Sequence, residues 1–345
     1  MLVDLLYKYG FDAEVEAIAY GNGLINHTWK VTAGSHHYIL QRINDNIFKK
    51  PEWISENISF IGDYLEKNSP DYLFVKPVKT TDGNVFVKNE NGFFRLFPFV
   101  EGSHSITTVD TPQQAYEAAK KFGEFTRRLD GLNPERLHIT LPSFHDLSLR
   151  VAQFTEALSY GNSSRIEESS QIIKQLKESA GLVKEYEKIV SGGILKKRVI
   201  HHDTKISNVL FDDKDKALCV IDLDTVMPGY FISDLGDMFR TYLCPVNEEA
   251  IDTNLIVIRD DYYKAIVSGY YEEMGRVFSE AEKNYFFYAG TFMIYMQALR
   301  FLTDYINNDK YYGARYEKHN LVRATNQMVL LKRLLEKERL LKTYK

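Results

Sequence analysis

One stretch of the sequence, HHDTKISN, constrains the fold more than any other. It brings His201, Asp203, Lys205 and Asn208 together within eight residues. The apolar run ALCVI follows a few residues later and leads directly to Asp222. Because this run has the length and composition of a buried strand, we expect the two groups of polar residues to lie beside a short strand pair. That pair would consist of RVIHH and ALCVIDLD.

These residue types match what phosphoryl transfer from ATP requires. Two side chains must hold Mg²⁺ against the phosphates of the nucleotide. A carboxylate must orient the acceptor hydroxyl and take its proton, and a nearby cation stabilises the charge on the γ-phosphate. The order H-x-D-x-K-x-x-N, followed by Asp222 and Asp224, supplies each of these types. The alternative interpretation is a charged turn on a solvated surface.

The same residues carry a family resemblance. HHDTKISN resembles the catalytic loop of the eukaryotic-like kinases and the aminoglycoside phosphotransferase family, and VIDLD resembles their metal-binding loop. The resemblance implies a protein-kinase-like, two-lobe α+β fold and the cofactors ATP and Mg²⁺. It makes Asp203 the catalytic base and places Lys205 on the γ-phosphate. The metal ligands would be Asn208 and Asp222, with Asp224 as a second candidate from the same loop.

The first hundred residues are predicted to form a small antiparallel sheet and one helix. TWKVTAG and HHYILQRIN have the composition of two strands joined by a Gly-Ser turn, and PEWISENISFIGDYLEKN has helical spacing with Pro51 at its start. The segment from PVKTT to FPFV is expected to form two or three strands with hairpin turns at DGN and ENG. We predict an N-terminal nucleotide-binding lobe over residues 1–100.

Helical patterns dominate the remainder of the chain. An amphipathic helix is predicted over residues 112–130, one or two helices over 144–190, and mostly helices from about residue 248 onward. The strand pair that carries the two motifs lies between these helical segments. We therefore predict a mainly helical, C-terminal catalytic and substrate lobe over residues 101–345.

A glycine-containing segment supports a nucleotide site in the first lobe. Gly21, Gly23 and Thr28 lie between two expected strands. A glycine-rich hairpin can lay backbone N–H groups over nucleotide phosphates, although a glycine turn between strands needs no ligand. Together with the downstream motif, the segment predicts contacts from these three residues to the nucleotide.

Two further segments bear on the nucleotide. The resemblance requires a phosphate-binding lysine on YILQRIN, but the matching position holds Gln41, with Arg42 beside it. Strand alternation places these two side chains on opposite faces, so only one can face the nucleotide. RLFPFVEGS resembles the hinge between kinase lobes, where Pro98, Phe99 and Val100 would meet the adenine.

The acceptor is expected to be a small neutral sugar. From Lys283 to the end, twelve Lys and Arg stand against five Asp and Glu, a net charge of +7 that disfavours polycationic acceptors. The runs GNGLINHTW, CVIDLDTVMPG, DLGDMFR and LRFLTDYINNDKYY resemble N-acetylhexosamine 1-kinases, which phosphorylate the anomeric hydroxyl of N-acetylglucosamine and N-acetylgalactosamine. This resemblance places the following residues near the sugar: Asp203, Asn208, Arg300, Tyr311 and Tyr312.

Several alternatives stay open from the sequence. Arg300 could instead form an ion pair with Asp304, one turn further along its helix. Asp234, Asp237 and Arg240 in DLGDMFR could brace the catalytic loop or have a purely structural role. Other acceptors of this kinase class include homoserine, choline, a methylthio-sugar or an aminoglycoside. A nucleotide-binding pseudokinase is the alternative from another functional class.

Charge and hydropathy limit the partners. The net charge of −4 gives no reason to expect a nucleic-acid or membrane surface, and no apolar run is long enough to span a bilayer. A cytoplasmic protein with a small-molecule partner is therefore expected. The oligomeric state cannot be predicted from these features.

Overall fold

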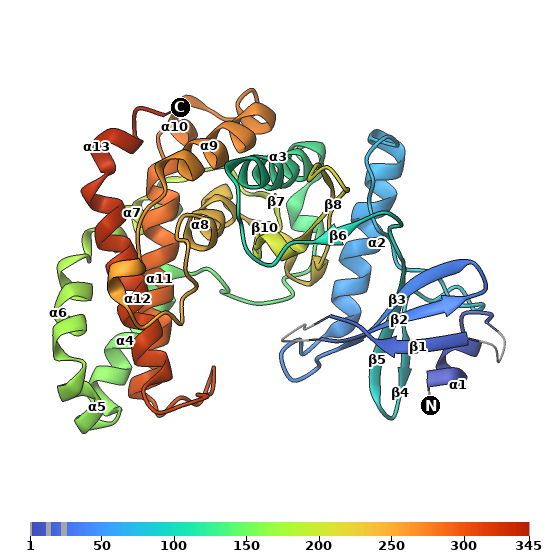
Figure 1. Cartoon of the computed structure of the whole chain (residues 1–345), viewed down its shortest axis with the longest axis horizontal. Helices are drawn as coiled ribbons and strands as arrows, with labels where there is room; N and C mark the ends of the chain where they lie inside the picture. Colours follow the sequence, from blue (N-terminus) through green and yellow to red (C-terminus); the bar gives the residue numbers. More distant parts are fainter. Residues whose placement is uncertain (1, 12–14, 22–25, 345) are drawn as a thin grey trace.

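A computed structural model of the chain, describing residues 2–11, 15–21 and 26–344, contains an antiparallel sheet beside a larger helical body (Figure 1). The predicted two-lobe α+β fold is confirmed, while the boundary at residue 100 stays a prediction. The five-stranded sheet has the order β1-β2-β3-β5-β4, with every neighbouring pair antiparallel. Its strands are β1 (Val15–Ala19), β2 (His27–Ala33), β3 (His36–Ile43), β4 (Val87–Asn89) and β5 (Gly92–Pro98).

The two faces of this sheet have different surroundings. On one face, Leu40 and Leu96 pair across β3 and β5 and join a small apolar core with Leu5 and Leu6 of α1 (Leu2–Tyr7). Because side chains alternate along a strand, the neighbouring positions point the opposite way. That second face turns toward the C-terminal lobe and carries the polar residues described below.

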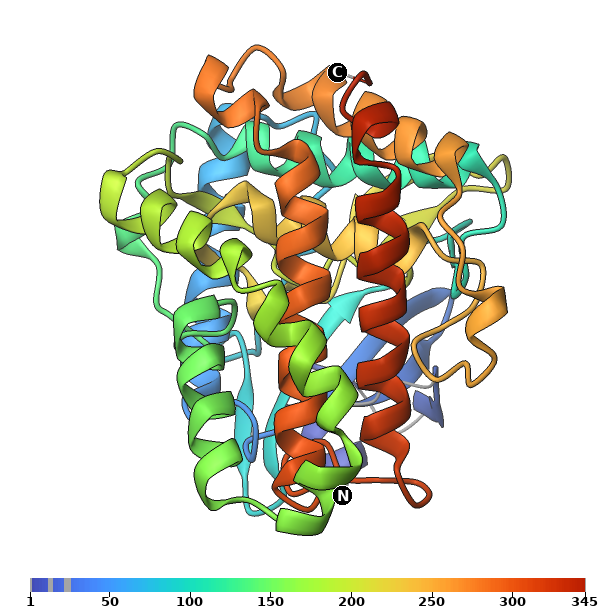
Figure 2. The same cartoon turned by 90° about the vertical axis from the view of Figure 1, so that its left-hand side faces the viewer.

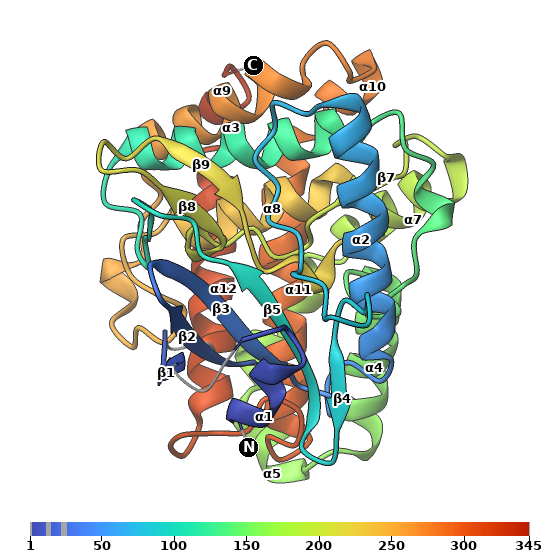
Figure 3. The ribbon, with the colours of Figure 1, turned by 90° about the vertical axis from the view of Figure 1, so that its right-hand side faces the viewer.

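Helix α2 (Pro51–Asn68) connects the two lobes (Figure 3). It begins at the predicted Pro51, whose fixed φ suits the first helical turn. Its buried Ile54, Ile58 and Ile61 repeat every three to four residues and pack into the main core. The side chain of Asn57 also donates hydrogen bonds to the backbone carbonyls of His138 and Val226. The predicted helix is confirmed at both ends.

The C-terminal lobe is built around the long helix α11, which packs against α4, α8 and α12 (Figure 2). Helices α3 and α9 pack against each other beside them. The helices of this lobe are α3 (Pro112–Arg128), α4 (Leu147–Tyr160), α5 (Ser163–Glu168), α6 (Ser170–Glu178), α7 (Gly181–Gly192), α8 (Phe231–Tyr242), α9 (Asp260–Met274), α10 (Glu280–Lys283), α11 (Phe286–Ile306), α12 (His319–Glu336) and α13 (Glu338–Leu341).

The prediction of one or two helices over residues 144–190 is wrong, because the chain forms α4, α5, α6 and α7 there. Local polar residues explain the breaks. The Asn162 side chain accepts a hydrogen bond from the Arg165 amide and so starts α5. Gly193 ends α7 in the left-handed conformation, with φ of 58°.

Short strands hold the two motif loops. Strand β6 (His104–Ser105) pairs with β8 (Val209–Phe211), which pairs with β9 (Ala217–Val220), and β7 (Arg198–Ile200) pairs with β10 (Met227–Gly229). The predicted pairing of RVIHH with ALCVIDLD is therefore wrong. Strands of three or four residues carry too little alternation to specify a partner. Both loops nevertheless leave these strands at the lobe junction.

Across the described ranges, no helix combines the length and the apolar character that a membrane span requires.

Candidate active site

The loop after β7 has a constrained backbone. His202 has a φ of 68°, a left-handed conformation that non-glycine residues rarely adopt. Asp234 of α8 holds it there, because its two carboxylate oxygens accept hydrogen bonds from the amides of His201 and His202 at 2.9 and 2.7 Å. The neighbouring Asp237 accepts from the Thr204 amide at 2.9 Å. Helix α8 therefore fixes the start of the loop.

Three of the predicted site residues lie together on this loop. The Lys205 ammonium lies 3.0 Å from a carboxylate oxygen of Asp203. Burial alone would lower the pKa of Lys205, but the charge and hydrogen bond of Asp203 outweigh it and raise that pKa. Asn208 donates its side-chain amide to the backbone carbonyl of Asp203 at 2.9 Å, which leaves its side-chain oxygen free to bind a ligand.

The second motif loop begins directly after β9. Asp222 has a φ of 59°, and the Ile221 amide donates to the carbonyl of Asn208, so the two loops are joined at their ends. Asp222 still reaches solvent, but no described residue donates a hydrogen bond to its carboxylate. Close packing of protein around it, then the charges of Asp224 and Asp203, raise the pKa of Asp222. A cation bound here would relieve this repulsion.

Asp224 faces the N-terminal lobe instead. One of its oxygens lies 2.5 Å from the Arg95 guanidinium, and the other accepts from the Asn26 amide at 2.8 Å. Arg95 and Asp224 are both almost completely buried. Asp224 thus links the two lobes through Arg95 and Asn26, and its role as a second metal ligand stays a prediction.

Arg95 is not among the site residues predicted from the sequence. It lies on β5 opposite Gln41 of β3, and the Gln41 side-chain oxygen accepts two hydrogen bonds from its guanidinium, at 2.9 and 3.1 Å. Thr28 of β2 is opposite Gln41, so the three side chains form one row on the face turned to the C-terminal lobe. Arg42 points to the other face, beside Gly92. A cation thus stands next to the position where the lysine was expected, contributed by another strand.

The structure describes only part of the glycine segment. Gly23 lies outside the described residues. Gly21 is exposed, with a φ of 74° and open space around the position of a side chain. The amide of Tyr20 donates to the carbonyl of Thr28 at 2.9 Å and closes the connection between β1 and β2. This turn lies at the end of the sheet where Asn26 contacts Asp224.

The segment predicted to be the hinge leaves the end of β5. Pro98 is the last residue of that strand, and the Phe99 amide donates to the carbonyl of His37 at 3.0 Å. The Phe99 ring contacts the rings of Tyr20 and His37 edge-on, and its side chain is half-buried. Val100 accepts a hydrogen bond from the Ser103 hydroxyl at 2.6 Å. These contacts place the segment between the lobes and close to the β1–β2 turn.

Three of the five residues predicted near the sugar lie on α11 and in the loop after it, whereas Asp203 and Asn208 belong to the loop after β7 and do not line the same cavity. Arg300 donates to the side-chain oxygen of Gln297 at 3.1 Å and lies 3.5 Å from the Tyr311 hydroxyl. Its guanidinium is about 5.5 to 5.9 Å from the ring centres of Tyr311 and Tyr312. The alternative ion pair with Asp304 is not formed, because Asp304 accepts hydrogen bonds from the backbone amides of both tyrosines.

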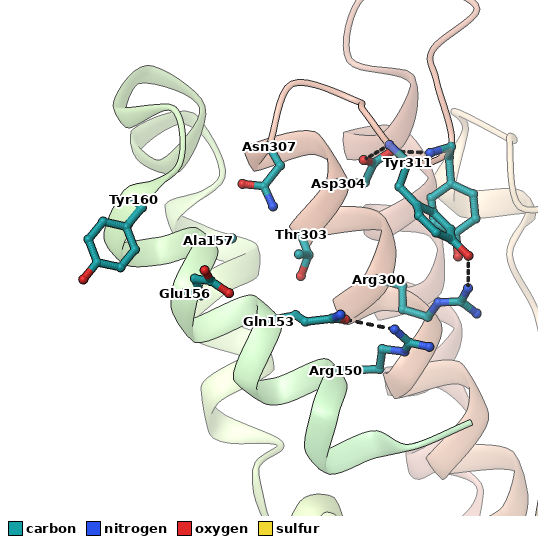
Figure 4. A pocket seen from close by; sticks show the side chains of 11 residues that line it. Arg150, Gln153, Glu156, Ala157, Tyr160, Arg300, Thr303, Asp304, Asn307 and Tyr311 are labelled. Atoms are coloured by element: carbon teal, nitrogen blue, oxygen red, sulfur yellow. Dashed lines mark hydrogen bonds between the residues drawn. The ribbon is translucent and has the colours of Figure 1, made fainter. Parts of the chain in front are cut away.

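These residues line a cavity of about 370 Å³ between α4 and α11 (Figure 4). Contacts through the rings of Phe144 and His202 connect this cavity to the catalytic loop. The Arg300 guanidinium lies 5.6 Å from the Phe144 ring centre, and the Phe144 ring lies 6.3 Å from that of His202. His202 directly precedes Asp203, the predicted base, so these contacts connect the cavity to the loop that carries it. Besides Arg300, Tyr311 and Tyr312, the lining residues include Arg150, Gln153 and Glu156.

Solved structures share this fold over almost the whole chain. A microcompartment-associated aminopropanol kinase is 16% identical, with a TM-score of 0.68 over 98% of this chain and 97% of the other. A spectinomycin phosphotransferase in complex with ADP and spectinomycin is 15% identical, with a TM-score of 0.60 over 98% of both chains. A choline kinase from Cryptosporidium parvum is 13% identical, with a TM-score of 0.59 over 95% of this chain and 92% of the other.

The sequence itself gives the stronger assignment. A family model for the phosphotransferase enzyme family matches residues 16–265. The matched segment contains nearly all of the sheet, both motif loops and helix α8, whereas helix α11 lies beyond it. The family predicted from the two motifs is confirmed: the chain belongs to the phosphotransferase enzyme family.

Proposed function

We propose that the protein transfers the γ-phosphoryl group of ATP to the anomeric hydroxyl of an N-acetylhexosamine, either N-acetylglucosamine or N-acetylgalactosamine. Membership of the phosphotransferase enzyme family supports a kinase acting on a small molecule. The observation that carries the choice of acceptor is the cluster of Arg300, Tyr311 and Tyr312 beside the catalytic loop. Its donors and ring faces suit a neutral sugar with an acetamide group.

Two residues fit a Mg²⁺ ion held against the nucleotide. The carboxylate of Asp222 and the side-chain oxygen of Asn208 have no described hydrogen-bond donor, and the Ile221 amide ties their backbones together. Mg²⁺ prefers oxygen ligands and commonly takes one or two carboxylates together with substrate phosphates. When bound, the ion would neutralise charge on the transferred phosphoryl group. Asp224 contacts Arg95 and Asn26, so we assign the ion first to Asp222 and Asn208 and keep Asp224 as the second candidate.

Asp203 and Lys205 act on the two reacting groups. The acceptor oxygen forms a bond to the γ-phosphorus while the bond from that phosphorus to the β–γ bridging oxygen breaks, and ADP leaves. Asp203 orients the acceptor hydroxyl and takes its proton. Lys205, held 3.0 Å from Asp203, places a positive charge beside the γ-phosphate oxygens. The Asp234 carboxylate keeps this loop in position through its two backbone amides.

The acceptor side argues against cationic substrates. Aminopropanol, choline and spectinomycin are the substrates named for the structural neighbours, and all of them carry amines or a quaternary ammonium group. A cation in the cavity would meet the guanidinium groups of Arg150 and Arg300. Like charges at close range disfavour such binding, and a buried polar site discriminates strongly between acceptors. These residues support an uncharged or acidic acceptor.

Product analysis tests the proposal. The protein is incubated with Mg-ATP and N-acetylglucosamine, and the product is identified by phosphorus and proton NMR. We expect phosphate on position 1 and no turnover of the methyl glycoside, in which that position is blocked. Phosphate on position 6, equal turnover of the methyl glycoside, or preference for a kanamycin-like polycation would each contradict the assignment. The last result would also contradict the charge argument.

A further inference from the structure

A second arginine lies beside Arg300 in the acceptor-side cavity. Arg150 of α4 donates to the Gln153 side chain at 2.9 Å (Figure 4). It also donates to the backbone carbonyls of Ser143 and Phe144 at 2.9 and 3.0 Å. These contacts fix the guanidinium from the protein side. Its Nε atom is buried and has no hydrogen-bond partner among the described residues.

This arginine pair has no direct ion-pair partner in the described part of the protein. Within the described ranges, no carboxylate lies at ion-pair distance from either Arg150 or Arg300. Asp304 is committed to backbone amides, and Glu156 lies toward the outer end of the cavity near Tyr160 (Figure 4). Burial and then the charge of Arg300 lower the pKa of Arg150. The two half-buried guanidinium groups repel each other, and the nearby Tyr311, Tyr312 and Asp146 offset this effect only in part, because the pKa of Arg150 stays lowered.

A nearby histidine does not compensate either. His145, at the start of α4, lies between the arginines and His202, and burial followed by the charges of His202 and Arg300 lowers its pKa. Its imidazole is therefore neutral near pH 7, and a histidine in either protonation state carries no negative charge that could pair with the arginines. The tyrosine hydroxyls and the Gln153 amide around the pair are neutral donors and acceptors as well. The missing partner is an anion.

We infer that Arg150 and Arg300 bind an oxyanion carried by the acceptor sugar, either a carboxylate or a phosphate or sulfate ester. Guanidinium groups match such oxyanions with paired hydrogen bonds. The cavity volume of about 370 Å³ lies within the range of small-molecule sites, and the ring chain through Phe144 connects it to the catalytic loop. An acidic N-acetylhexosamine is then a better acceptor than the neutral sugar. This inference rests on the proposed function and narrows its substrate class.

Acceptors that differ at one position test the inference. We would measure kcat/KM for N-acetylglucosamine, for its 6-sulfate and 6-phosphate, and for the corresponding 6-carboxylate, all with position 1 free. Loss of a charge-assisted contact is worth about tenfold to hundredfold in affinity. We expect Arg150→Gln to lower the ratio of acidic to neutral kcat/KM by that factor. Arg150→Lys keeps the positive charge but lacks the paired N–H donors of the guanidinium group. It should therefore restore part of the lost kcat/KM ratio.

Arg339→Gln removes an equal charge from an exposed position on α13 and serves as the control, with the ratio expected to stay within twofold. An unchanged ratio in Arg150→Gln would overturn the inference. So would acidic sugars that neither react nor compete with the neutral one. If Arg150→Gln does not fold, the same ratio is read from Arg150→Lys.

A binding measurement distinguishes an anion carried by the sugar from free inorganic phosphate. Calorimetry on the full chain with inorganic phosphate alone, and with the 6-phosphate sugar, reports binding without turnover. We expect the sugar phosphate to bind at least tenfold more tightly than inorganic phosphate, and Arg150→Gln to remove this difference. Equal affinity for both would contradict an anion carried by the acceptor. If neither neutral nor acidic N-acetylhexosamines are phosphorylated, the proposed function fails, and calorimetry still tests the anion site independently.

Discussion

At the scale of single residues, Asp203 is the position where a small change should affect chemistry most. Asp203→Asn keeps the size of the side chain but cannot take a proton from the acceptor. We expect turnover to fall by about 10²–10⁴ while ATP affinity stays within a few-fold. Calorimetry with Mg-ATP and steady-state kinetics measure the two quantities.

Asp213→Asn provides the matched control, because Asp213 is an exposed aspartate ten residues further along the chain. Its turnover should equal that of the parent. Near-normal turnover in a folded Asp203→Asn protein would contradict the role of base and would favour the pseudokinase alternative.

Residues that act within one local motif were predictable, and residues that meet across the fold were not. Asp203, Lys205, Asn208 and Asp222 are recognisable because their order and spacing along the chain reflect two adjoining loops. Arg95 carries no such signal. Its contact with Asp224 depends on the register of β3 with β5 and on how the sheet faces the C-terminal lobe.

Arg150 and Arg300 illustrate the same limit for the acceptor side. They are far apart in the sequence and meet only because α4 packs against α11. The sequence marks Arg300 as a candidate site residue because a lone arginine in an apolar helix must find a partner. Arg150 lies on a helix that carries other polar residues, so an arginine at this position gives no sequence signal of a binding site.

At the scale of secondary structure, helix α8 controls the conformation of the catalytic loop. The Asp234 side chain is fully buried and accepts two backbone amides, so Asp234→Asn leaves one of them without a proper acceptor. Such a loss costs about 1–3 kcal/mol of unfolding free energy. We expect that destabilisation in chemical denaturation, together with a fall in kcat that exceeds any change in the KM for ATP.

Asp82→Asn is the control for this change, because Asp82 is exposed in the turn before β4. Its unfolding free energy and kcat should match the parent. If Asp234→Asn loses stability but keeps its kcat, helix α8 supports the fold without shaping the active loop.

Long elements were predicted more accurately than short ones. Helix α2 has several turns of regular apolar spacing, and both of its ends were predicted. The pairing of β7 was not, since three residues cannot specify a register. The helices between residues 147 and 192 were merged for a related reason: each break depends on one or two capping residues, whose effect is smaller than that of the apolar pattern around them.

At the scale of the whole molecule, the two lobes are joined through a buried charge pair. Arg95 belongs to the sheet, Asp224 belongs to the loop of the C-terminal lobe, and Gln41 and Asn26 form hydrogen bonds to Arg95 and Asp224, respectively. One guanidinium nitrogen of Arg95 and one carboxylate oxygen of Asp224 lack a hydrogen-bond partner among the described residues. Because Asp224 follows Asp222 by two residues, the pair sets the position of the predicted metal-binding loop relative to the sheet that would cover the nucleotide.

Removing one partner should therefore uncouple the lobes. Arg95→Met leaves the Asp224 carboxylate buried and unpaired, which typically costs about 3–5 kcal/mol. We expect a loss of that size in unfolding free energy and a weaker affinity for Mg-ATP, both measured on the full chain. The double variant Arg95→Met with Asp224→Asn removes the unpaired charge, so it should regain part of the stability but not the nucleotide affinity. Arg276→Met, at an exposed turn, controls for loss of an arginine. Additive effects in the double variant would contradict the coupling, because independent sites add and directly paired residues do not.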